Sequence, residues 1–257
     1  MKRDSTVLAV VSGKGGVGKS VITVNLAESL AADGHRVAIV DADFGQNACS
    51  VLLNETPEAT VMDVLRYTAE PKDMRHATAM GITLIDVTTE PDGAFSREQE
   101  LYSRLDDLVT DLRGDHDYVL IDAPAGLEGP VRWAVDRADL TTLVIVGEPT
   151  AIADAYRLAR LIWTSDPSYP VATIVNFADS AEDASSVADR FSEITERFTG
   201  QLPNYLGWVP FSRSIRSSVM KQTPAARHEG PVRRAFEDLA RTVNAGRTLL
   251  AESVDPP

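Results

Sequence analysis

Apolar residues recur along the chain in two alternating patterns: short continuous runs, and longer stretches with helical spacing. Seven of the short runs are rich in β-branched residues and cover 6–12, 36–42, 82–87, 117–123, 141–147, 171–177 and 205–211. A strand formed by a continuous apolar run has apolar side chains on both of its faces. Such strands are typical of parallel sheets buried between two layers of helices. The pattern predicts an α/β fold, a doubly wound, mostly parallel sheet of about seven strands with helices on both faces.

Two stretches between these runs show helical periodicity clearly. Their apolar residues recur at spacings of three and four, as on one face of a helix. The two stripes are Leu101, Leu105, Leu108 and Leu112, and Val187, Phe191, Ile194 and Phe198. We expect all of these side chains to lie in the core.

Length and composition are those of one large α/β domain, with 257 residues and 44% hydrophobic content. We expect a single domain over 1–257, with a short frayed tail at about 250–257. Neither a secretory signal nor an apolar run of about 18 residues is present, which predicts a cytoplasmic protein without its own membrane anchor. The one cysteine, Cys49, is expected to be a small buried side chain.

The segment after the first run reads GKGGVGKS over residues 13–20 and fits the P-loop pattern G-x-x-x-x-G-K-[ST]. It follows a predicted strand and precedes a predicted helix ending near Gly34, which is the context that a P-loop requires. Its glycines let successive backbone N–H groups converge on phosphate oxygens. The predicted phosphate-binding positions are Gly15, Gly16, Val17, Gly18, Lys19, Ser20 and Val21.

Two side chains of this loop have specific predicted roles. Lys19 would reach the β- and γ-phosphates, and the hydroxyl of Ser20 would bind Mg²⁺, a hard cation that prefers oxygen ligands. The sequence therefore predicts a magnesium–nucleotide site.

Lys14 is a second lysine near the start of the loop, so that residues 14–20 read K-G-G-x-G-K-S. In this respect the chain resembles the MinD/ParA family of P-loop ATPases, whose deviant Walker A motif has this pattern. The resemblance implies ATP as the nucleotide, and implies that Lys14 reaches across a dimer interface to the partner's phosphates. An added cation there would stabilise charge on the transferred phosphoryl group. The alternative is a solvated loop lysine.

Carboxylates close two of the predicted strands. In VDADFGQNACS the resemblance implies that Asp43 orients or deprotonates the attacking water, while Asp41 sits nearer the metal or is simply a polar strand end. Asp122 ends another apolar run, as a Walker B acid with water-bound Mg²⁺ would. In the following D-A-P-A-G segment, Gly126 could offer its N–H to the γ-phosphate. Lys14, Lys19 and Asp43 are thus the candidate catalytic residues, and Ser20, Asp41 and Asp122 the candidate metal site.

The resemblance covers residues 7–245 and also suggests where the base binds. Asn176 and Pro210, at the ends of the last two predicted strands, occupy positions that hold adenine in relatives. The D-A-P-A-G segment is closest to the MinD/FlhG branch, whereas Asn47, Ala48 and Ser50 resemble ParA. Iron–sulfur members of the superfamily need several cysteine ligands, so a single Cys49 argues against that function.

Charge is unevenly distributed along the chain. The formal net charge is −13, yet residues 212–247 contain eight Lys or Arg against three acids, a local balance of +5. Such a segment either binds DNA phosphates or is a set of solvated helix faces.

These features predict an ATPase that dimerises with ATP, engages an unidentified activating partner protein and is reset by slow hydrolysis. Such a protein would position or regulate a cellular assembly. The alternatives are a ParA-like, non-specific DNA-binding ATPase using residues 212–247, and a metabolic ATP-dependent enzyme. The four histidines are scattered and form no second catalytic cluster, which disfavours the metabolic reading.

Overall fold

The protein is described by a computed structural model that covers residues 5–87, 98–127 and 129–254. One eight-stranded sheet runs through it in the order β3-β4-β2-β5-β1-β6-β7-β8. Every neighbouring pair is parallel except β3 and β4. The strands are β1 (Thr6–Ser12), β2 (Val37–Asp41), β3 (His76–Ala77), β4 (Thr83–Asp86), β5 (Tyr118–Ala125), β6 (Leu140–Ile145), β7 (Val171–Ala178) and β8 (Asn204–Pro210).

All seven predicted runs form strands, which confirms the doubly wound, mostly parallel sheet. The eighth strand, β3, was not predicted because its two residues are too few to show a periodic pattern. It pairs with β4 in antiparallel orientation at one edge of the sheet.

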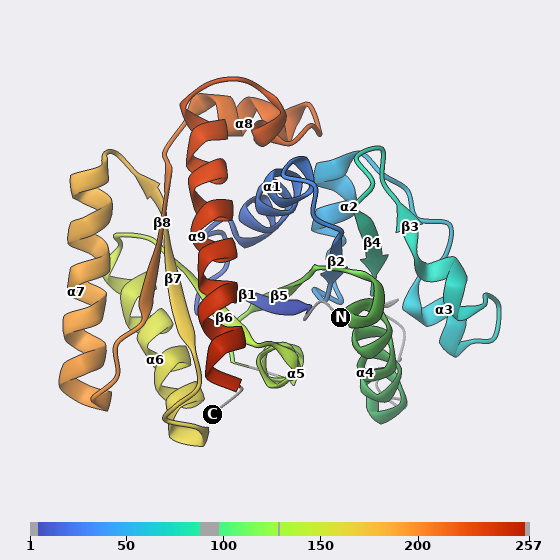
Figure 1. Ribbon diagram of the computed structural model, residues 1–257, viewed down its shortest axis with the longest axis horizontal. Helices are drawn as coiled ribbons and strands as arrows, with labels where there is room; N and C mark the ends of the chain where they lie inside the picture. The colour runs from blue at the N-terminus through green and yellow to red at the C-terminus, as the bar shows by residue number, and fades with distance from the viewer. Residues whose placement is uncertain (1–4, 88–97, 128, 255–257) are drawn as a thin grey trace.

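Helices cover both faces of the sheet (Figure 1). They are α1 (Lys19–Ala32), α2 (Ala48–Leu53), α3 (Val61–Leu65), α4 (Glu98–Asp115), α5 (Gly129–Arg137), α6 (Pro149–Ser165), α7 (Ala181–Thr199), α8 (Arg213–Met220) and α9 (Pro231–Val254), with 3₁₀ turns η1 (Pro71–Met74) and η3 (Ala225–Arg227). Alternate residues of β1 enter different cores. Leu8 and Val10 pack with α1 and α9, whereas Val7, Ala9 and Val11 pack with the α4 to α7 layer.

The prediction that both helical stripes lie in the core is confirmed for the α4 stripe and only in part for the α7 stripe. All four leucines of α4 are buried, as are Val187 and Phe191 of α7, and Ile194 is partly buried. The prediction is wrong for Phe198, which is 63% exposed. It lies in the last turn of α7, where its ring contacts Tyr156 and Arg197 instead of the core.

Helix α9 continues to Val254, and residues 255–257 lie outside the described residues, so the frayed tail expected at about 250–257 stays a prediction. Cys49 is fully buried, as predicted. Among the described residues, no helix combines the length and apolarity needed to cross a membrane.

The parallel pairing gathers polar side chains at one edge of the sheet. In the registers of β2 with its two neighbours, Asp41 stands opposite Asp86 of β4 and Asp122 of β5. The three carboxylates therefore form a row across adjacent strand ends. In open α/β sheets, ligands bind beyond these carboxyl ends of the strands.

A buried ion pair fixes the P-loop helix to the carboxyl-terminal segment. Glu28 of α1 has a side chain 2% exposed and accepts two hydrogen bonds from the Arg227 guanidinium of η3. Beside it, the Ala226 N–H donates to Asn25 Oδ1 at 2.8 Å. The position of α1 thus depends on a charge pair as well as on apolar packing.

Replacing Arg227 with Ala should leave Glu28 as an uncompensated buried charge. We expect a loss of about 3 kcal/mol in the free energy of unfolding, measured by urea titration. Arg241→Ala is the matched control, since Arg241 pairs with Asp238 on the exposed face of α9. A control loss as large as that of Arg227→Ala would contradict this account of the buried pair.

Candidate nucleotide site

The P-loop connects β1 to α1 and depends on glycine at two positions in particular. Gly18 forms the N-cap of α1 with a left-handed φ of 89°. A Cβ atom there would lie 2.4 Å from Asn176 Nδ2. A Cβ atom on Gly13 would lie 2.2 Å from the backbone carbonyl carbon of Asp154, so the start of the loop packs directly on α6. The loop is therefore held between α6 and the end of β7.

Lys19 and Ser20 open α1 above the end of β5. Lys19 is buried, and burial lowers the pKa of its amine, while the negative charges of Asp122 and Asp43 act in the opposite direction. Asp122 accepts hydrogen bonds from the Ser20 hydroxyl and, at 2.9 Å, from Thr23 Oγ1. The predicted metal-binding hydroxyl and the predicted Walker B acid are thus in contact.

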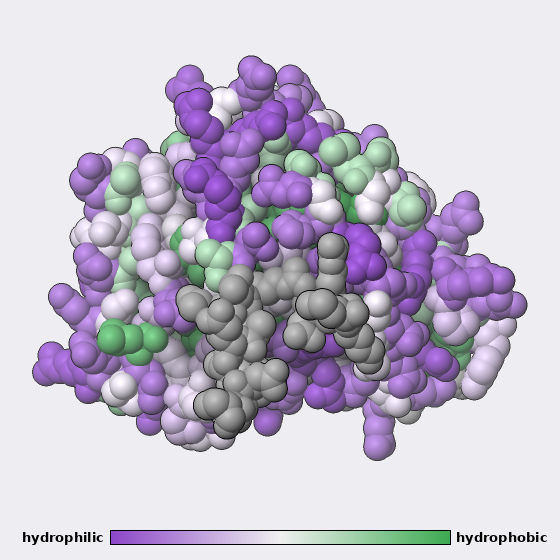
Figure 2. All heavy atoms as spheres, viewed as in Figure 1, coloured by the Kyte–Doolittle hydropathy of each residue, from purple (hydrophilic) through white to green (hydrophobic). Residues whose placement is uncertain are grey.

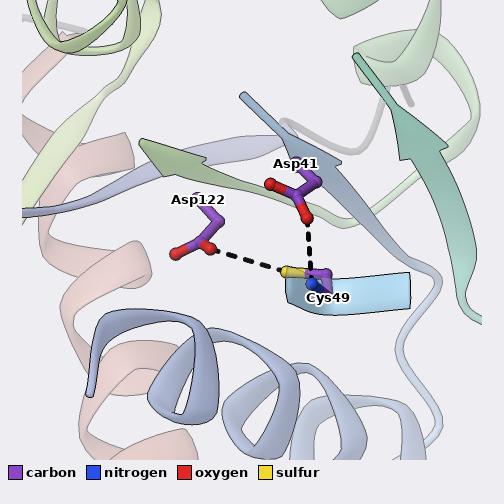
Figure 3. Close-up of side chains that lie close together, drawn as sticks. All are labelled: Asp41, Cys49 and Asp122. Atoms are coloured by element: carbon purple, nitrogen blue, oxygen red, sulfur yellow. Dashed lines mark hydrogen bonds between the residues drawn. The ribbon is translucent and has the colours of Figure 1, made fainter. Parts of the chain in front are cut away.

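Cys49 lies between two buried carboxylates, as Figure 3 shows. Its backbone N–H donates to Asp41 Oδ2 at 2.9 Å, and its thiol donates to Asp122 Oδ2 at 3.6 Å. Burial, followed by the charge of Asp122, raises the pKa of Asp41 well above its usual range. Burial also raises the pKa of Asp122, against the effect of its hydrogen bonds and of Lys19. Both carboxyls are therefore costly to ionise at their buried positions, and a cation near them would lower that cost.

An open pocket of about 960 Å³ lies over these groups. Its walls come from the P-loop and the start of α1, the segment between β2 and α2, helix α2 itself, the end of β5 and one residue of β7. Predicted site residues among its lining are Gly15, Gly16, Gly18, Lys19, Ser20, Val21 and Asp43. The remaining P-loop position, Val17, is buried behind the loop. The pocket's size and its lining by the glycine-rich P-loop suit a nucleotide.

Lys14 lies outside this lining. Its Nζ pairs with Glu148 Oε2 at 2.7 Å and lies 3.4 Å from Thr150 Oγ1, at the start of α6. The side chain is therefore held by α6 of its own chain and takes no part in lining its own pocket. Its predicted action on a second subunit stays a prediction.

The backbone N–H of Gly126, predicted to bind the γ-phosphate, is already used in a hydrogen bond within the chain. Its N–H donates to the Ser12 carbonyl at 3.0 Å, so a bond to a γ-phosphate would require this hydrogen bond to be exchanged. The φ of Gly126 is 112°, a left-handed value that glycine adopts readily at the end of β5.

The predicted base-binding residues lie at the ends of β7 and β8. Asn176 is 3% exposed and donates from Nδ2 to the Val17 carbonyl at 2.8 Å, which fastens the P-loop to β7. Its Oδ1 is buried without a hydrogen-bond partner. Pro210 is half-buried and aligned with Ala178. An unpaired buried acceptor of this kind suits an amino group of a bound base.

Sequence reasoning missed three residues at this site. Thr23 follows Lys19 by one helical turn, so its contact with Asp122 could have been found from helical spacing. Cys49 and Phe177 had no comparable signal, because their positions depend on the packing of α2 and on an irregularity in β7.

The fold and this site define a P-loop nucleotide-binding protein. The family described as ParA, NUBPL iron-transfer P-loop NTPase, matches residues 4–244. The chain therefore belongs to the ParA family of P-loop NTPases.

Named relatives agree with this assignment. The antiactivator FleN of Pseudomonas aeruginosa is 32% identical over 216 residues, which cover 84% of this chain and 77% of FleN. The septum site-determining protein MinD of Synechocystis is 34% identical over 164 residues, 62% of this chain and 60% of that protein. The structure of Pyrococcus horikoshii MinD complexed with Mg-ADP matches with a TM-score of 0.79 at 23% identity, covering 96% of this chain and 98% of that one. This last likeness shows the shared fold.

The cost of ionising Asp41 at its buried position, which the charge of Asp122 increases, predicts a pH dependence. A carboxyl whose pKa is raised on folding stabilises the protein at low pH, and this contribution is lost as the pH rises from its usual value near 3.8 through the folded-state pKa. Asp41→Asn has no charge to bury. Its stability relative to the original protein should therefore rise between pH 4 and pH 8, as measured by urea unfolding in EDTA. Asp33→Asn, at an exposed site, serves as the control, and parallel pH profiles for the original protein and Asp41→Asn would refute the raised pKa of Asp41.

Proposed function

We propose that this protein is a Mg²⁺-dependent ATPase that works as an ATP-dependent dimeric switch and positions or regulates a larger cellular assembly. The observation that carries the proposal is the pair of lysines in one P-loop. Lys19 lines the chain's own pocket, whereas Lys14 lies outside the lining and pairs with Glu148. Similarity to FleN and MinD supports the regulatory role.

The residues present fit ATP and Mg²⁺. Oxygen ligands suit Mg²⁺, and the Ser20 hydroxyl and the carboxylates of Asp41 and Asp122 would hold it, the carboxylates through water. The ion would neutralise charge on the β- and γ-phosphates. Lys19 binds those phosphates, and Asp43, which lines the pocket, orients the attacking water.

The ion pair of Lys14 with Glu148 is easily exchanged for a contact with a second subunit, which supports dimerisation. The Lys14 and Glu148 side chains are 41% and 65% exposed, and ion pairs with such exposure contribute little to stability. In the dimer, Lys14 leaves Glu148 and meets the partner's phosphates. Slow hydrolysis stimulated by a partner protein then resets the pair.

An iron-transfer function is less well supported. The family description mentions it, but Cys49 is the one cysteine of the chain and is fully buried against Asp122. A cluster would need an accessible thiolate, whereas burial raises the pKa of this thiol.

A mixing experiment tests the action of Lys14 on the partner. Lys14→Ala and Asp43→Ala should each hydrolyse ATP very slowly. In a mixed dimer, one site combines Asp43 of one chain with Lys14 of the other. An equimolar mixture should therefore recover about a quarter of the original rate, since about half of the dimers are mixed and each has one complete site.

A binding control makes the mixing result decisive. Each variant should bind Mg-ADP with its affinity little changed, which shows that both are folded. A mixture as inactive as its components would mean that Lys14 does not act on the partner.

DNA binding is the second candidate function, and the surface of α8 favours it. Of the seven basic residues in 212–247 whose side chains the structure describes, three pair with acids, namely Arg227, Arg233 and Arg241. Arg213, Arg216 and Lys221 are exposed on or beside α8, over which Figure 2 shows mainly hydrophilic surface. No ion pair involves these three among the described residues.

Salt dependence would identify DNA binding through α8. With ATP present, binding to duplex DNA should fall steeply between 50 and 200 mM salt, and R213A/R216A should reduce the salt slope by about two. No binding at the lower salt concentration would remove this second function.

A further inference from the structure

Phe177 interrupts the pairing between β7 and β8. Asn176 aligns with Val209 and Ala178 aligns with Pro210, so Phe177 is the extra residue of a β-bulge. Its φ is 61°, in the left-handed region that aromatic residues rarely adopt. Bulges of this kind redirect side chains and are common beside active sites, and strained backbone gathers at ligand-binding positions.

The bulge turns the Phe177 ring out of the sheet and into the nucleotide pocket. Both neighbours, Asn176 and Ala178, are buried, whereas Phe177 is 42% exposed and is the one residue of β7 among the described pocket-lining residues. Its Cζ lies 3.5 Å from where a Cβ of Gly18 would be. The ring therefore stands beside the last glycine of the P-loop, where α1 begins.

Phe211 supports this ring from the side. The two ring centroids are 6.2 Å apart at an interplanar angle of 82°, an edge-to-face contact. The Phe211 N–H donates to the Ala178 carbonyl at 3.0 Å, which holds the two chain segments together. Since Phe211 is itself 70% exposed, the pair does not act as core packing.

The neighbouring Asn176 gives independent support for a ligand here. Its Oδ1 is buried and has no hydrogen-bond donor. An apolar ring face beside an unpaired acceptor matches the two properties of a purine that carries an amino group, a flat π surface and an N–H donor.

We propose that Phe177, supported edge-on by Phe211, stacks on the purine base of the bound nucleotide and provides much of the affinity for the base. The inference rests on the proposed function, in that the phosphates occupy the P-loop. It assigns the base affinity to a residue outside the P-loop and outside the predicted base-binding pair.

Calorimetric titration with two ligands tests this assignment. Mg-ADP carries the base, whereas magnesium tripolyphosphate presents phosphates alone. Phe177→Ala should weaken Mg-ADP binding by about 10- to 100-fold, in the range expected for loss of one base–aromatic stack, and should leave tripolyphosphate binding unchanged. Phe177→Trp should retain the affinity for Mg-ADP. Phe198→Ala, which removes another exposed aromatic ring at the end of α7, is the matched control and should bind both ligands normally.

The other outcomes separate this inference from the function on which it rests. Unchanged Mg-ADP affinity in Phe177→Ala would overturn the inference and leave the proposed ATPase intact. An equal loss for both ligands would also overturn it, because Phe177 would then shape the P-loop and not contact the base. If the original protein bound neither ligand, the proposed function itself would fail.

Discussion

The burial of two adjacent carboxyls, Asp41 and Asp122, is the constraint around which the site is organised. Parallel pairing of β2 and β5 aligns the two residues, and burial denies them the solvation that would screen their charges. Lys19 and the donor groups of Ser20, Thr23 and Cys49 surround them. This arrangement explains why a bound cation and a phosphate-binding loop belong together at this edge of the sheet.

The helices that contact this carboxylate site also contact the segment that follows α8 at the surface. Helix α2 presents Cys49 to both carboxylates, and its Val51 carbonyl accepts a hydrogen bond from Gln222 Nε2, just beyond α8, at 3.1 Å. Helix α1 begins in the P-loop and is joined to η3 through Glu28 and Arg227. The exposed basic surface of α8 is therefore anchored to the two helices that border the nucleotide pocket.

Much of this could be predicted from the sequence because it depends on local pattern. Buried parallel strands are continuous apolar runs, and the spacing of glycines and lysine in residues 13–20 determines where phosphate binds. The row of strand-end carboxylates then follows from parallel pairing. Phe198 shows where periodicity fails, because a helical stripe does not reveal where a helix passes beyond its core.

The remaining features depend on contacts between segments far apart in the chain. The pairing of Lys14 with Glu148 depends on how α6 packs on the loop, and the hydrogen bond from Gly126 to Ser12 depends on the register of β5 with β1. Phe177 lines the pocket because of a β-bulge, and no pattern in the sequence predicts that bulge. The contacts of Lys14, Gly126 and Phe177 are therefore known from the structure and could not be predicted from the sequence.

Light scattering after size-exclusion chromatography on Asp43→Ala, with Mg²⁺ and either ADP or ATP, tests whether ATP makes this protein a dimer. This variant should bind ATP without turning it over, so we expect a dimer with ATP and a monomer with ADP. A monomer with both nucleotides, in a variant shown to bind each of them, would contradict the switch and return a metabolic role to consideration.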